Sequence, residues 1–397
     1  MFKTIASKRP LLDQARLVRD MTGKSIRAQV AEILALRLGY GRLYASEYYD
    51  FRLYDDREFP GVKKREFLGS RLEAKISESV NCITWDMIEE DKLMAYAVLG
   101  GLSLPIPRMN AIYHRKGRRY CALPTLRSPS ELAEYLRNDA TYPFFGKPVR
   151  GCFGRGGFAV SGLDRAADRL TFSNGDSASV NEFVAGLERL EGLDSAEFAQ
   201  HGYILQEYLA PHPVIQEACG NISSIRLLVL LHDEGPKVFR AVWKVPRRGN
   251  MTDNFHRGIS GNMLGWISAS TGSVEHVVRG VGPRQERVVT HPDTGHRLPG
   301  LRLPDWDALV NVGLIAAASL PRLPFLHFDI AMTDRGPVVL EVNVLGSLDL
   351  VQLPAPSGLY DEELRSFLAR HALDPKARLE HERANRWFSA AAASERR

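Results

Sequence analysis

The sequence has 397 residues, with 44% hydrophobic and 25% charged side chains, and this length predicts two or three domains or subdomains. No run approaches the roughly 18 apolar residues that a membrane-spanning helix needs, and no apolar stretch with a cleavage site follows the N-terminus, so we expect a cytoplasmic protein. The formal net charge of +5 is dispersed without an aromatic-interleaved basic motif, which argues against a specific nucleic-acid partner.

Four cysteines are scattered along the chain. Their spacing shows no CxxC pair and no Cys/His pattern of the kind that holds zinc. We therefore expect free thiols in a reducing compartment at the following positions: Cys82, Cys121, Cys152 and Cys219.

The first part of the chain, residues 1–85, has a mostly helical pattern, clearest at 28–41, where apolar residues at helical spacing end in glycine. Residues 86–102 are predicted to form one helix. Asp86 is expected to cap it, with Glu89 three residues later, and the prolines after residue 103 end it. We interpret 1–85 as a helical extension.

The middle of the chain alternates between helix and strand signals, and its end returns to helix. We expect a helix near 128–138, a strand, glycine-rich turn and strand over 141–162, and a strand near 201–209. Strand-like runs follow at 224–232 and 237–246, then an apolar helix at 305–320 and a last strand pair. The predicted divisions after the extension are 86–210, 211–360 and a charged helical tail, 361–397.

The last strand pair, FLHFDIAMT and PVVLEVNVL, is joined by the turn residues of 334–336. In a hairpin centred on Arg335, residue 329 faces 341 and residue 327 faces 343. Because side chains alternate along a strand, one face then holds His327, Asp329, Glu341 and Asn343. The other face is apolar, and we assign to it Phe328, Ile330, Leu340 and Val342.

Two carboxylates directly opposed on a strand pair, with Cβ atoms about 4.5–5.5 Å apart, repel each other. A divalent cation removes this repulsion, and two carboxylates with one carboxamide offer the hard oxygen ligands that suit Mg²⁺. We therefore predict a metal site at Asp329, Glu341 and Asn343. The alternative is a solvent-exposed acidic face without a metal.

The segment GKPVRGCFGRGG contains Lys147 directly before a glycine-rich loop. Glycines let backbone N–H groups approach phosphate oxygens, and a lysine adds a mobile positive charge. The spacing matches neither a Walker A motif nor a dinucleotide fingerprint, so a simple hairpin turn remains the alternative. The candidate nucleotide-binding residues are Lys147, Gly154, Gly156 and Gly157.

A strand ending in QEYL precedes a proline-interrupted connection that resembles a hinge. Its residues Gln206, Glu207, Tyr208 and Leu209 are candidates for contact with an adenine edge. Further on, neighbouring strands carry Arg226, Arg240 and Lys244, which we expect to form a basic cluster for phosphates or a substrate carboxylate. The alternative is that these cations point to solvent.

Together these motifs resemble the ATP-grasp superfamily, and more specifically its sugar-transfer-associated group. The resemblance covers about 86–346 and rests on the segments DKLMAYAVLGGLSLPIP, SSIRLLVL, VWKVPRRGNMTDNFHRGISG and FDIAMTDRGPVVLEVN. The chain departs from the group at 256–259, where members usually have a second glycine. The resemblance implies an α+β fold in which two subdomains clamp ATP, here with a helical N-terminal extension.

The resemblance also implies roles. Lys92 and Lys147 hold phosphates of ATP, Mg²⁺ binds at the hairpin, and Arg226 or Lys244 stabilises the transferred group, with Asn343 at the same centre. The implied reaction is ligation of a carboxylate to an amine through an acyl phosphate, and the name of the group implies a glycan or sugar acid as the carboxylate. An ATP-grasp kinase and a nucleotide-binding module without turnover remain open. The tail, ERANRWFSAAAASERR, is compatible with weak membrane-surface association.

Overall fold

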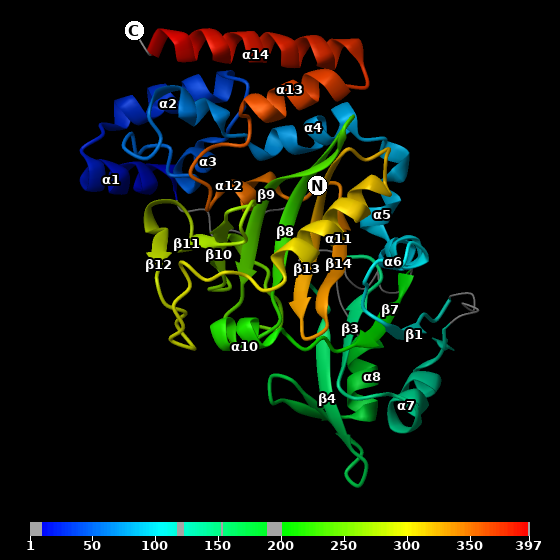
Figure 1. Ribbon diagram of the computed structural model, residues 1–397. Helices are drawn as coiled ribbons and strands as arrows, with labels where there is room; N and C mark the ends of the chain where they lie inside the picture. The colour runs from blue at the N-terminus through cyan, green and yellow to red at the C-terminus, as the bar shows by residue number, and fades with distance from the viewer. Residues whose placement is uncertain (1–9, 117–122, 152–153, 189–200, 396–397) are drawn as a thin grey trace.

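The protein is described by a computed structural model, which covers residues 10–116, 123–151, 154–188 and 201–395. Its centre is formed by two seven-stranded sheets (Figure 1). The first has the strand order β2-β1-β7-β3-β4-β5-β6, with these strands in chain order: β1 Met109–Tyr113, β2 Thr125–Leu126, β3 Phe144–Pro148, β4 Phe158–Asp164, β5 Arg169–Phe172, β6 Ser177–Ser179 and β7 Tyr203–Glu207.

The second sheet has the order β12-β11-β10-β9-β8-β13-β14 and is antiparallel throughout. Its central strands are buried along nearly their whole length, which explains their continuous apolar sequences. The strands are β8 Ser224–His232, β9 Gly235–Val245, β10 Met263–Ile267, β11 Val274–Arg279, β12 Glu286–Val288, β13 Phe325–Thr333 and β14 Gly336–Asn343.

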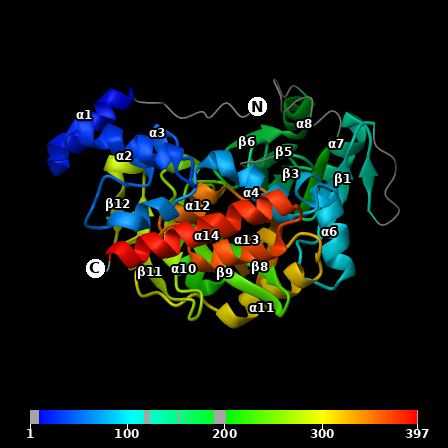
Figure 2. The same ribbon diagram turned by 90° about the horizontal axis from the view of Figure 1, so that it is seen from above.

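Helices gather at both ends of the chain and around the sheets (Figures 1 and 2). The α-helices are α1 Leu11–Thr22, α2 Ile26–Leu38, α3 Ala45–Asp50, α4 Glu73–Val80, α5 Met87–Glu90, α6 Lys92–Gly101, α7 Pro129–Asn138, α8 Val180–Glu188, α10 Pro213–Cys219, α11 Trp306–Ala318, α12 Leu348–Gln352, α13 Glu362–His371 and α14 Pro375–Glu395. Short 3₁₀ turns are η1 Gly61–Glu66, η2 Ser70–Leu72, η3 Ile83–Trp85, η4 His256–Gly258 and η5 Gly282–Arg284.

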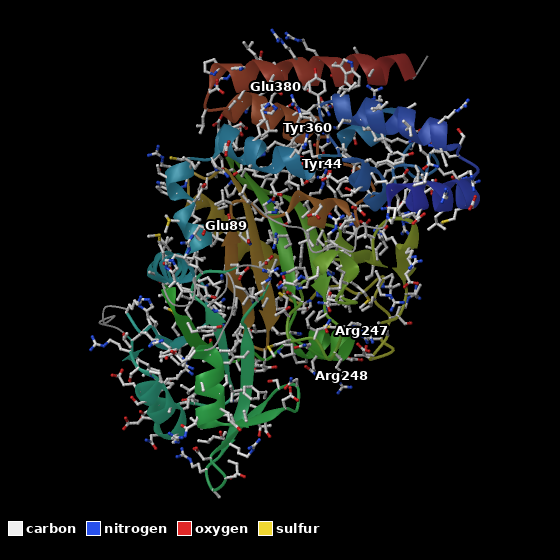
Figure 3. All side chains as sticks on the ribbon, turned by 180° about the vertical axis from the view of Figure 1, so that it is seen from behind. Tyr44, Glu89, Arg247, Arg248, Tyr360 and Glu380 are labelled. Carbon is white, nitrogen blue, oxygen red and sulfur yellow. The ribbon has the colours of Figure 1, made fainter. Side chains whose placement is uncertain are left out.

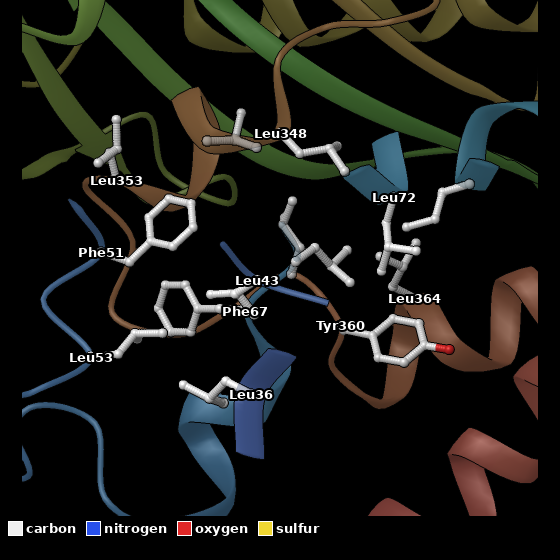
Figure 4. Close-up of a cluster of buried hydrophobic side chains, with 14 of the residues drawn as sticks. Leu36, Leu43, Phe51, Leu53, Phe67, Leu72, Leu348, Leu353, Tyr360 and Leu364 are labelled. Atoms are coloured by element: carbon white, nitrogen blue, oxygen red, sulfur yellow. The ribbon is translucent and has the colours of Figure 1, made fainter. Parts of the chain in front are cut away.

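The N-terminal helices and the last two helices share a core with the second sheet. Figure 4 shows this cluster, in which Leu43 and Phe67 from the N-terminal part meet Leu348 and Leu364 from the C-terminal part. All four side chains are almost fully buried. Burial of apolar area is the main force that holds such layers together, so these helices are integral to the fold.

The predicted α+β class and the helical N-terminal segment are confirmed. One predicted helix is wrong, because residues 86–102 form two helices that meet at Asp91. Its side chain accepts hydrogen bonds from the N–H groups of Leu93 and Met94, whereas Asp86 makes no side-chain cap. An aspartate at this position begins a new helix, so Lys92 becomes the first residue of α6.

The β13–β14 hairpin has the predicted register at the four polar positions of the candidate metal face. Asp329 pairs with Glu341 and His327 with Asn343, and a β-bulge then shifts the register beyond Asp329. The bulge places Leu340 outside the apolar face, because Val339 pairs with Ile330 and is fully buried in its place. The assignment of Leu340 to the core face was therefore wrong.

Cys82 and Cys219 are free thiols, as expected, while Cys121 and Cys152 lie outside the described residues. Within the described ranges, none of the helices combines the length and the apolar character needed to cross a bilayer.

Candidate functional site

A buried charge cluster lies across three adjacent strands of the second sheet. Arg226 on β8 donates from Nε and Nη2 to both carboxylate oxygens of Asp329 on β13, and the Nη2 distance is 3.0 Å. Lys244 on β9 donates to the same carboxylate at 3.0 Å. Burial alone would raise the pKa of Asp329, but the charges of Arg226 and Lys244 outweigh it and lower that pKa. Asp329 is therefore ionised at any physiological pH.

A second carboxylate, Asp253, completes this cluster and was missed by sequence reasoning. It lies 3.1 Å from the Lys244 ammonium and accepts hydrogen bonds from the N–H and hydroxyl of Ser224 at 2.7 and 2.6 Å. Burial alone would lower the pKa of Lys244. The negative charges of Asp253 and Asp329 outweigh this effect and raise that pKa, so the ammonium stays charged. The only available signal was an acid in the loop after a lysine-bearing strand.

The side chain of Glu341 is far more accessible than that of Asp329. It is 39% exposed, against 4% for Asp329. Its nearest cation is Lys92, whose Nζ lies 3.8 Å from the Glu341 carboxylate. Glu341 is thus the carboxylate of the hairpin that a ligand can reach.

Two lysines from α6 and the first sheet lie near Glu341. Lys92, at the start of α6, also donates to the carbonyl of Gly151 at 2.8 Å. Lys147, on β3, donates to the Tyr96 hydroxyl at 2.7 Å, and Tyr96 donates to the carbonyl of Leu340 at 3.0 Å. Burial lowers the pKa of Lys147, while Glu341 and Asp329 oppose this change. Tyr96 was not predicted, and nothing in its sequence context distinguishes it from a core tyrosine.

The glycine-rich segment reaches the loop that follows β9 of the second sheet. A Cβ atom at Gly154 would lie 2.8 Å from both Asn254 Nδ2 and Thr252 Cγ2. Gly154 and Gly156 have φ values of +69° and +70°, which favour glycine. Gly157 lies between them and β4, and its N–H donates to the carbonyl of Gly154. The segment therefore contacts the 252–254 loop through backbone that only glycine permits.

The hinge residues fall at the end of β7. Gln206 is 3% exposed, and its Oε1 has no hydrogen-bond partner among the described residues. Glu207 accepts from the N–H of Arg108 and from Arg335 Nη2, both at 2.8 Å, so its carboxylate clamps β1 to the β13–β14 turn. Tyr208 and Leu209 continue into the connection, where Pro211 bridges to Thr333.

The loop after β14 is held by two glutamates from the N-terminal helices. Glu89 on α5 accepts from the N–H groups of Val344 and Leu345, both at 2.9 Å. Glu73 on α4 accepts from the N–H of Ser347. Figure 3 shows Glu89 beside the strands of the second sheet. Burial raises the pKa of each carboxyl to about 7. Neither glutamate was predicted for this position.

The same loop contacts the charge cluster directly. Arg226 Nη1 donates to the carbonyl of Gly346, and a Cβ atom at Gly346 would overlap the His327 ring. His327 is fully buried, and burial lowers its pKa to about 3, so the ring is neutral. Among the described residues, neither ring nitrogen has a hydrogen-bond partner, and the same holds for Asn343 Nδ2.

The predicted place of Arg240 in the basic cluster was wrong. Arg240 lies on β9 four residues before Lys244 and forms an ion pair with Asp361 at 2.6 Å. Asp361 caps the N-terminus of α13, so Arg240 anchors the C-terminal helices. The spacing placed Arg240 and Lys244 on one face but could not show that the strand carries them to different partners.

Residues 72–367 match the model of the family described as sugar-transfer associated ATP-grasp proteins. The chain belongs to this family. No curated protein matches the sequence significantly. ATP with Mg²⁺ is the nucleotide typical of ATP-grasp proteins, as predicted from the sequence.

Several solved structures resemble the chain at low sequence identity. D-alanine–D-alanine ligase from Bacillus anthracis is 15% identical with a TM-score of 0.40, over 83% of this chain and 79% of that one. An ADP complex of N5-carboxyaminoimidazole ribonucleotide synthetase is 10% identical with a TM-score of 0.34, over 68% and 50%. The biotin carboxylase domain from Hydrogenobacter thermophilus, with MgADP, is 12% identical with a TM-score of 0.35, over 74% and 50%. The chain spans about half the length of the first such structures or less.

The residues of this ATP-grasp site fit a hard cation. A carboxylate offers about four lone-pair sites, and Asp329 uses three for Arg226 and Lys244, which leaves one. Glu341 is accessible and Asn343 adds a carboxamide. In the described parts of the chain, no group of three or more His, Cys, Asp or Glu side chains is arranged to hold a metal ion. At the hinge, the Oε1 atom of Gln206 has no hydrogen-bond partner among the described residues and is available to accept one.

Proposed function

We propose that this ATP-grasp protein is an ATP-dependent carboxylate–amine ligase that works through an acyl phosphate. One observation carries the proposal. Lysines from the first sheet and α6 meet the carboxylates of the β13–β14 hairpin, with Lys92 Nζ 3.8 Å from Glu341. This is the arrangement expected where a metal-bound triphosphate lies between two subdomains.

The charge balance of the site supports anionic substrates. Four cations, Lys92, Lys147, Arg226 and Lys244, stand against three carboxylates, Asp253, Asp329 and Glu341. Among the described residues, the Lys147 ammonium donates to the neutral Tyr96 hydroxyl and forms no ion pair within 4 Å. A cation held in a largely buried place without a carboxylate in contact favours a phosphate.

We assign the following roles. Lys147 and Lys92 bind the α- and β-phosphates of ATP, and Gln206 with the backbone of Tyr208 and Leu209 orients the adenine. Glu341, Asn343 and the remaining lone pair of Asp329 hold Mg²⁺, which neutralises phosphate charge when bound. Arg226 and Lys244 fix Asp329 in its orientation and hold it ionised, so they act on the metal site through this carboxylate.

The proposed reaction balances in two steps. An oxygen of the substrate carboxylate attacks the γ-phosphorus of ATP, the bond to the β–γ bridging oxygen breaks, and ADP leaves. The amine nitrogen then attacks the acyl carbon, phosphate leaves with the carboxylate oxygen, and the nitrogen gives up its proton. Positioning and fixed charges supply most of the rate enhancement in such chemistry.

Water must be excluded while the acyl phosphate exists. The contact of Gly154 with Thr252 and Asn254 supports a lid at the glycine-rich segment that closes on the second sheet. In this proposal, residues 86–210 form the subdomain that carries the lid and α6, and residues 211–360 form the catalytic subdomain. The helical extension 1–85 precedes them, and the helical tail 361–397 follows them.

The family description links these proteins to sugar transfer, and a glycan or sugar acid is the carboxylate that we propose, in a cytoplasmic protein. Phosphorylation of a hydroxyl is the other reaction that this machinery can support.

The test incubates the protein with Mg-ATP, pooled uronic and amino acids, and hydroxylamine. Formation of a hydroxamate with ADP supports the ligase. A stable phosphorylated product without hydroxamate identifies a kinase, and no turnover with any acid identifies a binding module.

A further inference from the structure

Helix α2 is apolar on two sides. Its inner side, with Ile26, Ile33 and Leu36, packs against the N-terminal core. Its outer side carries a stripe at helical spacing, formed by Val30, Leu34 and Leu38. These three side chains are 49%, 55% and 86% exposed. A helix that is apolar all round is normally buried all round, so the outer stripe of α2 calls for a partner.

The segment that carries this stripe is positively charged. Residues 10–44 contain six Lys or Arg and three Asp or Glu, a net charge of +3, whereas residues 45–397 sum to −1. Among the described residues, the positive surplus therefore lies in the segment that carries α1 and α2. Within it, Arg27 lies one turn before the Val30–Leu34–Leu38 stripe and is exposed.

An aromatic residue of the tail lies beside the same helix. Trp387 on α14 packs against Tyr40, two residues beyond Leu38, with ring centroids 5.9 Å apart. Trp387 is 36% exposed, whereas its neighbour Phe388 is buried. Figures 1 and 2 show α14 running past the α1–α2 end of the molecule. Tryptophan is enriched where a protein meets the headgroup region of a bilayer.

We propose that the α2 stripe, with Trp387 and the surrounding cations, docks on an anionic lipid bilayer. Apolar side chains inserted at the interface and cations near anionic headgroups each contribute modestly, and stable attachment needs both. A second copy of the chain is the less favourable occupant. A two-fold dimer places the same patch on both subunits, so two segments that each carry a net positive charge would face each other.

From the sequence, weak membrane contact was expected through the tail. In the structure Phe388 of the tail is in the core, whereas Leu379 and Trp387 are partly exposed, and the α2 stripe adds a second exposed apolar surface that was not predicted. Docking through α2 is independent of the proposed ligase reaction.

The test is flotation of the purified full chain, without ATP, with vesicles of phosphatidylcholine alone and vesicles with added phosphatidylserine. We expect binding to the anionic vesicles that weakens with salt. The variant Leu34→Glu/Leu38→Glu should lower that binding by roughly tenfold or more. The control Val289→Glu/Ile315→Glu makes the same charge change at side chains that are 49% and 45% exposed elsewhere, and it should keep at least most of the binding.

Thermal unfolding should show that both double variants remain folded, and light scattering should show the parent and the α2 variant in the same oligomeric state. Absence of parent binding to anionic vesicles overturns the proposal. Equal losses in the two double variants also overturn it, since charge alone would then explain the binding. A dimer that dissociates in the α2 variant, without vesicle binding by the parent, would assign the stripe to self-association instead.

Discussion

Asp329 and Glu341 lie directly opposite each other on β13 and β14, yet only Asp329 is enclosed by cations. Arg226 and Lys244 occupy three of its lone pairs, while Glu341 is 39% exposed and 3.8 Å from Lys92. The two carboxylates are therefore expected to differ in what they contribute. In the proposed function, Asp329 mainly stabilises the sheet and orients the site, and Glu341 is the carboxylate most open to Mg²⁺.

Replacing Asp329 by Asn should destabilise the protein. The change removes the carboxylate that pairs with the buried Arg226 and leaves Lys244 with Asp253 alone, and breaking one partner of a buried ion pair costs about 3–5 kcal/mol. Chemical denaturation measures the free energy of unfolding. A loss below about 1 kcal/mol, the range of an ordinary substitution, would show that the cluster is not what holds these strands.

Replacing Glu341 by Gln should leave the fold intact and weaken the metal. The side chain keeps its size but loses the charge that a hard cation prefers. We expect the Mg²⁺ concentration needed for half-maximal ATP turnover to rise by at least about tenfold. The measurement is turnover over a Mg²⁺ series, with thermal unfolding as the folding control. Unchanged metal dependence would remove Glu341 from the metal site.

Lys147→Ala should raise the KM for ATP by about tenfold or more, the effect of losing about 1.4 kcal/mol of binding. ATP should also stabilise this variant less in thermal unfolding. Tyr96→Phe is the matched comparison, because it removes the hydroxyl that links Lys147 to Leu340 but keeps the cation. Equal stabilisation by ATP in Lys147→Ala and the parent would show that Lys147 does not touch the nucleotide.

Gly154→Ala should reduce turnover because the added Cβ meets Thr252 and Asn254. Gly175 supplies the control, since it has φ +91° and nothing within 4 Å of an added Cβ. Both substitutions carry a similar backbone penalty of about 1–2 kcal/mol. Only Gly154→Ala should slow ATP turnover. A similar loss in both variants would mean that the contact with the second sheet has no part in closure.

Glu73 should make stability fall as the pH rises. Burial raises its pKa from 4.5 to about 7 in the folded protein, so the folded state binds this proton more tightly than the unfolded chain. The proton therefore stabilises the fold at low pH and is lost as the pH rises from 4.5 to 7. Relative to Glu73→Gln, the parent should lose about 1–3 kcal/mol over this window. Parallel pH profiles in urea denaturation would contradict this.

Period-two alternation was enough to predict the hairpin face, because Asp329, Glu341 and Asn343 are set by local geometry. The bulge at Leu340 was not visible in the sequence, since either register satisfies the apolar pattern nearby. The break at Asp91 was missed because Asp86 and Asp91 are equally good caps by type. Contacts between residues that are distant in sequence could not be predicted, because local patterns do not show which segments dock on each other. Glu89 meets Val344 only after the N-terminal helices dock on the second sheet.

The partners of the cations were the least predictable part of the site. Arg240 and Lys244 are both cations and lie four residues apart on one face of β9. Arg240 nevertheless pairs with Asp361, and Lys244 pairs with Asp253 and Asp329. Nothing in β9 itself distinguishes them, because the acids come from other segments. The division of the chain at residues 85, 210 and 360 likewise stays a prediction that limited proteolysis can test.

The transfer of a carboxylate oxygen to phosphate tests the central claim most directly. Once the hydroxylamine screen identifies an acid, that acid is labelled with ¹⁸O in its carboxylate and turned over with Mg-ATP and an amine. Ligation through an acyl phosphate predicts that the released phosphate carries one ¹⁸O atom from the acid. Amide formation with unlabelled phosphate, or ADP release with the label retained on a phosphorylated alcohol, would contradict it.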